Sequence, residues 1–190
     1  MGEIVFDGQQ TDERILATII PHSVAKQIAF AKVSFLALFL FLVAGMISSA
    51  VPAIGTTILV GGFLLSILAL GGGIWWTTTT YAAAKTYLTD RRIIRFEAVS
   101  PFFVTKRALF WNEALKAKGY IPNLLYKVLR MGHLRVEPHL AEHEDVFVPN
   151  VEYYEDLANY IDKILFTFKN RPDEIGSLKP FIPKPRGQRD

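Results

Sequence analysis

The sequence predicts an α+β membrane protein, in which a two-helix transmembrane hairpin precedes an antiparallel β-domain that a C-terminal helix caps. Three observations support this fold class. No charged side chain occurs between Lys32 and Lys85. Short runs of aromatic and β-branched residues follow, and turn residues separate them. After Asn150, apolar residues recur at spacings of three and four, which is typical of an amphipathic helix.

The charge-free stretch divides into two apolar runs, 33–51 and 56–76, on either side of the sequence Pro-Ala-Ile-Gly. Each run has about the 20 residues that an α-helix needs to cross ~30 Å of hydrocarbon. Because the connection between the runs is so short, no folded domain fits there, and the rest of the chain is expected on one side of the bilayer. A soluble helical hairpin is disfavoured, because a chain of 190 residues has too little other apolar surface to cover both helices.

Basic residues flank the apolar runs and indicate their orientation. Lys32 precedes the first run and Lys85 follows the second, whereas the connection carries no charge. By the positive-inside rule, we expect a multi-pass protein of the cell inner (plasma) membrane with both termini in the cytoplasm. Trp75 and Trp76 close the second run, and indoles favour the headgroup layer. We therefore interpret Lys32, Trp75, Trp76 and Lys85 as membrane-interface anchors.

Small residues four positions apart recur within the apolar runs, at Gly45/Ser49, Gly62/Ser66 and Ala69/Gly73. This spacing lets helix backbones approach closely in lipid, so we expect the hairpin to pack on itself or on a partner. The runs contain no Asp, Glu, His, Lys or Arg. Because proton relays and ion pathways in membranes use such groups, a transporter or an intramembrane hydrolase is disfavoured.

Residues 1–32 are expected to form a short cytoplasmic leader. Within it, residues 15–20 are compatible with a strand or with an interfacial segment, and periodicity does not decide between them. Ser23 can cap a helix that continues into the first apolar run.

Residues 77–170 are expected to form one cytoplasmic domain. Its apolar runs predict a meander of antiparallel strands and one further hairpin, at 81–89, 93–99, 103–111, 114–121, 134–137 and 145–148. Asn123 begins a helical stretch over 124–130 that Gly132 can end in a left-handed cap. Asn150 can cap the amphipathic helix over 154–168, which is expected to cover one face of the sheet.

Two further features concern aromatic residues and the C-terminal tail. Phe110 and Trp111 are neighbours on a predicted strand, so one should face the core and the other solvent or a partner. Residues 171–190 combine four prolines with Lys and Arg, a composition that favours an extended, disordered tail.

Composition narrows the possible partners. The net charge of +3 is modest, and the positive excess lies beside the apolar runs and in the tail, where anionic lipid attracts it. No nucleic-acid partner is needed to explain this pattern. The chain has no cysteine, so disulfides and Cys-ligated metals are excluded.

Several stretches carry a family resemblance. They are residues 87–94, residues 123–125 with 131–136, the pair Pro149-Asn150, and the acidic leader at 12–16. Together they resemble the bacterial pleckstrin-homology-like family of membrane-flanked domains, whose Thr-x-x-Arg-hydrophobic turn is similar to residues 89–93. Residues 97–101 depart from the family, which often has a glycine there. The resemblance implies a partly open antiparallel β-barrel capped by the last helix, and it implies no single chemistry.

The candidate lipid-headgroup site consists of basic residues on neighbouring predicted strands, namely Arg91, Arg92, Arg95, Lys106 and Arg107. Gathered on a face towards the bilayer, they would suit a lipid phosphate, which Arg contacts in a bidentate manner. The alternative is non-specific attraction to anionic lipid. Asp90 and Glu97 would reduce the positive charge of this patch.

A metal or catalytic site has weaker support. His139, Glu142, His143 and Glu144 resemble a ligand cluster, but Pro138 indicates a hairpin loop, and the glutamate that follows the first histidine of zinc proteases is missing. We therefore expect no metal, no cofactor and no catalytic residue. The sequence favours a membrane-anchored scaffold that binds a protein partner or its own copies. Recognition of an anionic lipid is the alternative, and a membrane-surface enzyme using His139 and His143 is a remote one.

Overall fold

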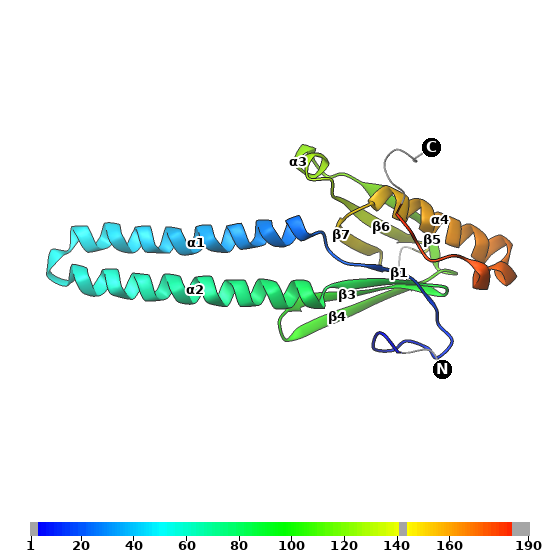
Figure 1. Ribbon diagram of the computed structural model, residues 1–190, viewed down its shortest axis with the longest axis horizontal. Helices are drawn as coiled ribbons and strands as arrows, with labels where there is room; N and C mark the ends of the chain where they lie inside the picture. The colour runs from blue at the N-terminus through cyan, green and yellow to red at the C-terminus, as the bar shows by residue number, and fades with distance from the viewer. Residues whose placement is uncertain (1–3, 141–143, 184–190) are drawn as a thin grey trace. The chain divides into compact units, whose positions relative to one another are not determined.

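The computed structural model describes residues 4–140 and 144–183 (Figure 1). The chain forms two compact units. The helical unit contains Ser23–Ala83 and Ala98–Phe103, and the sheet unit contains the remainder of the described chain. As expected from the sequence, the protein combines two long apolar helices with antiparallel sheets and a C-terminal helix.

The helical unit is built from α1 (Ser23–Ala50), the short 3-10 helix η1 (Pro52–Ile54) and α2 (Gly55–Ala83). Both long helices have the length and apolar composition needed to cross a membrane. Helix α1 begins with Ser23 as its first residue, whereas Ser23 was expected to precede the helix as its cap. Helix α2 continues beyond Trp76 to Ala83, and the hydroxyls of Thr79 and Thr80 donate to the carbonyls of Trp75 and Trp76 within it, both at 2.9 Å. The strand expected from residue 81 therefore begins only at Lys85.

The two long helices pack on each other through small side chains. A Cβ atom added to Gly62 would lie 2.1 Å from the Cβ of Ala44, and one added to Gly73 would lie 2.4 Å from Val33 Cγ1. A Cβ atom on Gly45 would meet nothing within 4 Å. The expectation that the hairpin packs on itself is thus confirmed at Gly62 and Gly73, whereas Gly45 does not take part in the contact.

Gly62→Leu is expected to separate α1 from α2, because the new side chain has no room beside Ala44. The contact can be measured by disulfide formation between cysteines introduced at Val33 and Gly73 in this cysteine-free chain. We expect cross-linking to fall about tenfold, since overpacking a tight contact costs about 1 to 3 kcal/mol. Gly45→Leu is the matched control and should leave cross-linking unchanged. Equal losses in the two variants would contradict the observed packing face.

The sheet unit contains two antiparallel sheets. The first has the order β1-β2-β3-β4 and the second the order β5-β6-β7. The strands are β1 (Ile15–Ile19), β2 (Lys85–Thr89), β3 (Arg92–Ser100), β4 (Phe103–Phe110), β5 (Ala114–Tyr120), β6 (Gly132–Pro138) and β7 (Val146–Val151). Residues 15–19 are therefore a strand, which settles the alternative that the sequence left open.

Strand β1 pairs with β2, with Ile19 opposite Thr86. The leader is therefore not separate from the domain, and the expected domain limits of 77–170 are too narrow. Helices α1 and α2 form an insertion between two neighbouring strands. Only residues 20–22 connect β1 to α1, and only residue 84 connects α2 to β2.

Helix α4 (Tyr154–Asn170) supplies one side of the core of the sheet unit. Its buried residues Leu157, Ile161 and Ile164 belong to the same cluster as residues of both sheets, among them Leu16, Leu88, Ile93, Trp111, Leu134 and Val136. The apolar spacing seen in the sequence is the reason, because it places one face of α4 against the sheets. Trp111 is fully buried and Phe110 is 38% exposed. This confirms the expectation that one of these two residues faces the core and the other faces outwards.

Two helix ends differ from the expectation. Helix α4 begins after Tyr153, whose φ is 57°, and Asn150 lies in β7 instead of capping the helix. Asn123 caps helix α3 (Leu124–Val128), because its side chain accepts a hydrogen bond from the N–H of Tyr126. The left-handed residue that follows α3 is Arg130, with φ of 58°, whereas Gly132 already belongs to β6. In both places a residue other than glycine or asparagine takes the unusual backbone conformation.

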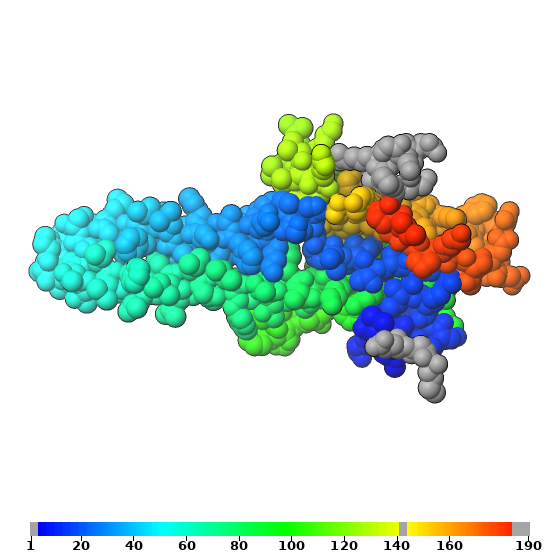
Figure 2. Space-filling model, viewed as in Figure 1, coloured from blue at the N-terminus to red at the C-terminus, as the bar shows by residue number. Residues whose placement is uncertain are grey.

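Residues 171–183 are ordered, which corrects the expectation of a disordered tail. The 3-10 helix η2 (Pro172–Ser177) follows α4, and Leu178 is buried in the core. The N–H of Phe181 donates to the carbonyl of Leu16 at 2.8 Å. Figure 2 shows this red C-terminal segment beside the blue N-terminal segment. Leu178 and Phe181 provide the apolar contacts that the proline-rich composition obscured. The last part of the expected tail, 184–190, lies outside the described residues.

Candidate functional site

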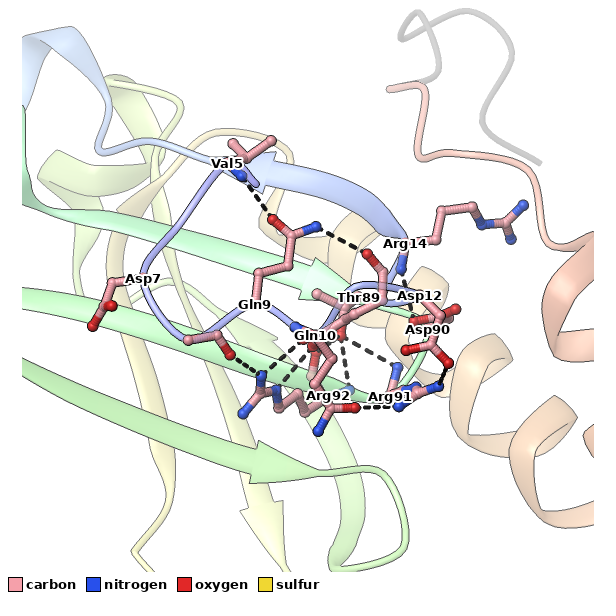
Figure 3. A network of polar contacts seen from close by, with 12 residues as sticks. Val5, Asp7, Gln9, Gln10, Asp12, Arg14, Thr89, Asp90, Arg91 and Arg92 are labelled. Atoms are coloured by element: carbon pink, nitrogen blue, oxygen red, sulfur yellow. Dashed lines mark hydrogen bonds and ion pairs between the residues drawn. The ribbon is translucent and has the colours of Figure 1, made fainter. Parts of the chain in front are cut away.

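The N-terminal loop and the turn between β2 and β3 form a polar network around Glu13 and Arg92. Figure 3 shows this network, with Arg92, Thr89 and Gln10 among the labelled residues. Arg92 Nε donates to Glu13 Oε1 and Arg92 NH2 donates to Glu13 Oε2, both at 2.8 Å. The side chain of Glu13 is completely buried and that of Arg92 is 11% exposed. This is a bidentate ion pair inside the fold, joining residues that are far apart in the sequence.

Further hydrogen bonds complete the network. The hydroxyl of Thr89 lies 2.9 Å from Glu13 Oε1 and accepts the N–H groups of Arg91 and Arg92. Arg92 NH2 also donates to the carbonyl of Gly8 at 2.7 Å. The N-terminal loop is thus attached to the β2–β3 turn through side chains from both segments.

The environment of Glu13 determines its protonation. Burial alone raises the pKa of this carboxyl group, but hydrogen bonds from Arg92, the Gln10 backbone and Thr89, together with the Arg92 charge, outweigh it. The resulting pKa of Glu13 is about 2, against an ordinary value of 4.5. Glu13 is therefore a carboxylate at neutral pH, and it neutralises the buried guanidinium.

The other candidate cations are also engaged with acceptors. Arg91 contacts Gln10 Oε1 and Asp12 Oδ2. Arg95 NH2 lies 3.1 Å from Glu97 Oε1, and burial lowers the pKa of Arg95 while Glu97 opposes this effect.

On β4, Arg107 pairs with Glu144 at 3.2 Å, and Lys106 Nζ donates to the carbonyl of Asp7 at 2.8 Å. The structure therefore brings Arg91 and Arg92 to the N-terminal loop and places Arg95 and Arg107 around the shared carboxylate of Glu97. The five residues do not form one group of unpaired cations.

The residues interpreted as membrane-interface anchors lie on three elements. Lys32 is exposed on α1, and Lys85 is the exposed first residue of β2. Trp75 and Trp76 are 52% and 47% exposed on α2. The ring of Trp75 lies 5.8 Å, between centroids, from the ring of Phe102 in the β3–β4 turn.

The histidine loop holds no metal-ligand cluster within the described residues. Nε2 of His139 lies 3.0 Å from Lys169 Nζ, and Glu144 pairs with Arg107. Among residues 4–140 and 144–183, no three His, Cys, Asp or Glu side chains are grouped as metal ligands. Glu142 and His143 lie outside this described part of the chain.

Two surface features were not expected from the sequence. Helix α3 exposes three apolar side chains, with Leu124 76%, Leu125 57% and Val128 70% exposed. A groove of about 920 Å³ runs between α4 and the C-terminal segment, and its lining includes Tyr160, Lys163, Phe166, Arg171, Phe181 and Ile182. The groove depends on the fold of residues 171–183, so the sequence held no direct signal for it. The Leu-Leu-x-x-Val pattern of α3 can be seen in the sequence, but a helix buried in a core has the same pattern.

No protein family, curated protein or solved structure matches the chain. The class of the protein is therefore defined by its own features. It is an α+β protein in which two helices long enough to span a membrane are inserted between the first two strands of a two-sheet unit.

Proposed function

We propose that the protein is a membrane-anchored binding module that assembles a protein partner, or copies of itself, at the cytoplasmic face of the inner (plasma) membrane. In this proposal α1 and α2 cross the bilayer. The observation that carries it is the exposure of both helices. In the most apolar 18-residue window of each helix, only 6% and 11% of the residues are buried. A helix in a soluble core would be covered by protein, whereas these helices need an apolar solvent.

The arrangement of the sheet unit supports a pleckstrin-homology-like domain. Sheets of four and three antiparallel strands share one core with a C-terminal helix. Two antiparallel sheets covered by a C-terminal helix are compatible with the partly open, helix-capped barrel that the family resemblance implies. The proposed role of such a domain is binding, because a fold of this kind carries no chemistry of its own.

The α3 surface formed by Leu124, Leu125 and Val128 supports a protein partner. Three large apolar side chains on one short helix, each more than half exposed, are typical of an interaction site. Lys127 and Arg130 lie beside them in the sequence and would form a polar rim. Anchoring in the membrane would raise the local concentration of the module for any partner that is also membrane-bound.

Recognition of an anionic lipid headgroup has less support from the contacts. A phosphate bound by Arg92 would have to displace Glu13, and one bound by Arg95 would compete with Glu97. Breaking a buried ion pair costs about 3 to 5 kcal/mol, which exceeds the ~1 kcal/mol per residue that anionic lipid returns near its surface. We therefore propose protein binding as the function and treat lipid recognition as an outcome of its test.

Substituting Leu124, Leu125 and Val128 together by Ser is expected to release the partner that tagged full-length protein captures from detergent-solubilised membranes. Loss of an apolar hot spot costs about 2 kcal/mol or more, so the captured amount should fall about 30-fold. Leu115→Ser, at a residue that is 44% exposed on β5, is the matched control and should retain the partner.

Charge reversal at Arg91, Lys106 and Arg107 separates the two functions. We expect it to leave partner capture unchanged. If this variant loses selectivity for anionic vesicles, and the α3 variant still captures its partner, lipid recognition replaces protein binding as the function.

A further inference from the structure

The turn between β3 and β4 is an exposed apolar tip, which we define as residues 98–104. Between Glu97 and Lys106 there is no charged residue. Val99 is 67%, Phe102 74% and Phe103 72% exposed. Large apolar side chains exposed to this extent are costly in water, and three of them close together on a single turn indicate a surface that meets an apolar environment.

The register of the strands shows how far the tip extends. Lys85, the first residue of β2, pairs with Phe96 of β3. Strand β3 continues for four residues beyond this pair, to Ser100, a distance of roughly 13 Å. Helix α2 covers about 12 Å between Trp75 and its end at Ala83, at its rise per residue. The length of β3 beyond Phe96 therefore matches the length of α2 beyond Trp75. The rings of Phe102 and Trp75 are in contact, with 5.8 Å between their centroids.

Contact with Trp75 places the tip at a particular depth. Trp75 stands at the end of the second apolar run, where an indole prefers the boundary between headgroups and acyl chains. A side chain packed on this indole lies at the same level. Residues 98–103 of the tip belong with α1 and α2 in the helical unit, whereas Val104 and the bases of β3 and β4 belong to the sheet unit.

The backbone of the turn is suited to a medium without water. Ser100 Oγ accepts the N–H of Phe102 at 3.3 Å and the N–H of Phe103 at 3.2 Å. Pro101, between Ser100 and Phe102, has no N–H to satisfy. Unpaired backbone N–H groups are what normally exclude a turn from the lipid boundary, and here these donors already have an acceptor inside the chain.

We propose that the tip is a third membrane contact, in which Val99, Phe102 and Phe103 insert into the boundary layer beside Trp75. The inference rests on the proposed membrane insertion of α1 and α2. Its occupant is the lipid of the leaflet that contains Trp75, since the tip continues the surface that these helices present to lipid. The consequence is that the protein contacts this leaflet through the β3–β4 turn as well as through α1 and α2.

Depth-dependent quenching in the full-length protein tests this contact. The chain has no cysteine, so single cysteines at Phe103, Leu68 and Ser177 can each carry one environment-sensitive fluorophore. The protein is reconstituted in vesicles of phosphatidylcholine and phosphatidylglycerol that contain spin-labelled lipid. We expect the label at Phe103 to be quenched by the spin-labelled lipid, as the label at Leu68 within α2 is. The label at Ser177, which is exposed on η2, should respond only to aqueous iodide.

The outcomes separate this inference from the function it rests on. If Leu68 is quenched by lipid and Phe103 only by iodide, the tip contact is wrong and the membrane anchor stands. If Phe103 is protected from both quenchers, the tip is covered by protein, which also overturns the inference. If Leu68 itself escapes the lipid quencher, the membrane anchor fails and the tip contact fails with it.

A substitution at the tip provides a second measurement. With the label at Val99, the double change Phe102→Asp and Phe103→Asp should reduce lipid quenching to the level found at Ser177. The same change should leave quenching at Leu68 unaltered. Because both phenylalanines are about three-quarters exposed, the fold should tolerate the change, and persistent quenching at Val99 would overturn the inference.

Discussion

Glu13→Gln is expected to lower the free energy of unfolding of the sheet unit by about 3 to 5 kcal/mol, because Arg92 would remain buried without a counter-charge. Glutamine keeps the size of the side chain and one acceptor oxygen, but it replaces the second acceptor by an amide NH2 group, so the change removes the charge together with one acceptor. Amide hydrogen exchange of β2 and β3 in the full-length protein, held in a mild detergent, measures the effect.

Two variants control this prediction. Asp12→Asn removes the partner of Arg91, but these side chains are 72% and 41% exposed, so the loss should stay below about 1 kcal/mol. The double change Glu13→Met and Arg92→Met removes both charges and should recover much of the stability, since apolar replacement of a buried pair is often neutral. Equal destabilisation by Asp12→Asn and Glu13→Gln would show that burial of the pair has no special importance.

The same ion pair gives stability a defined pH dependence. The pKa of Glu13 is about 2 in the folded protein and 4.5 as an ordinary value. The contribution of Glu13 is therefore fully present above about pH 4.5 and is lost as the pH falls towards 2. This difference in pKa corresponds to about 3 kcal/mol. The Glu13→Gln variant lacks this carboxylate at every pH. The difference in the free energy of unfolding between the wild-type protein and the variant should therefore narrow as the pH falls through this acid range.

Trp111→Ala is expected to cost about 3 to 5 kcal/mol, because the indole is fully buried and its removal leaves a large cavity. The change also removes the hydrogen bond from Trp111 Nε1 to the carbonyl of Thr89, at 3.0 Å. Urea denaturation of the full-length protein, followed by circular dichroism, measures the loss.

Phe110→Ala, at the neighbouring residue that ends β4, is the matched control. Phe110 is 38% exposed, and the Arg92 guanidinium lies over its ring, 5.4 Å from the ring centroid. Its removal should cost about 1 kcal/mol, the size of an exposed cation–π contact. If Phe110→Ala is as damaging as Trp111→Ala, the assignment of the two faces of β4 and the following turn is incorrect.

Patterns that repeat along the chain were predictable from the sequence. The absence of charge between Lys32 and Lys85 identified both long helices, and the spacing from Leu157 to Ile164 identified α4 and its buried face. In each case many neighbouring residues carry the same signal, so one atypical residue does not change the result.

Contacts between distant parts of the chain were not predictable. Nothing near Arg92 in the sequence shows that Glu13 neutralises it, so the arginine was interpreted as available for phosphate. Residues 171–183 have a composition typical of disorder, and only the fold shows that Leu178 reaches the core and that Phe181 bonds to Leu16. Local composition predicts the conformation of an isolated segment. The conformation of residues 171–183 and the pairing of Arg92 depend instead on contacts with distant parts of the protein.

The insertion of α1 and α2 between β1 and β2 restricts the number of times that the chain can cross a bilayer. Ile19 and Thr86 are neighbours in one sheet, so the polypeptide that leaves after β1 must return to the same aqueous compartment. Only an even number of crossings meets this condition. A chain with one helix inserted would leave its first two strands on opposite sides, and the sheet would stay incomplete until the second helix entered. In a membrane, pairing of β1 with β2 would therefore require that both α1 and α2 have been inserted.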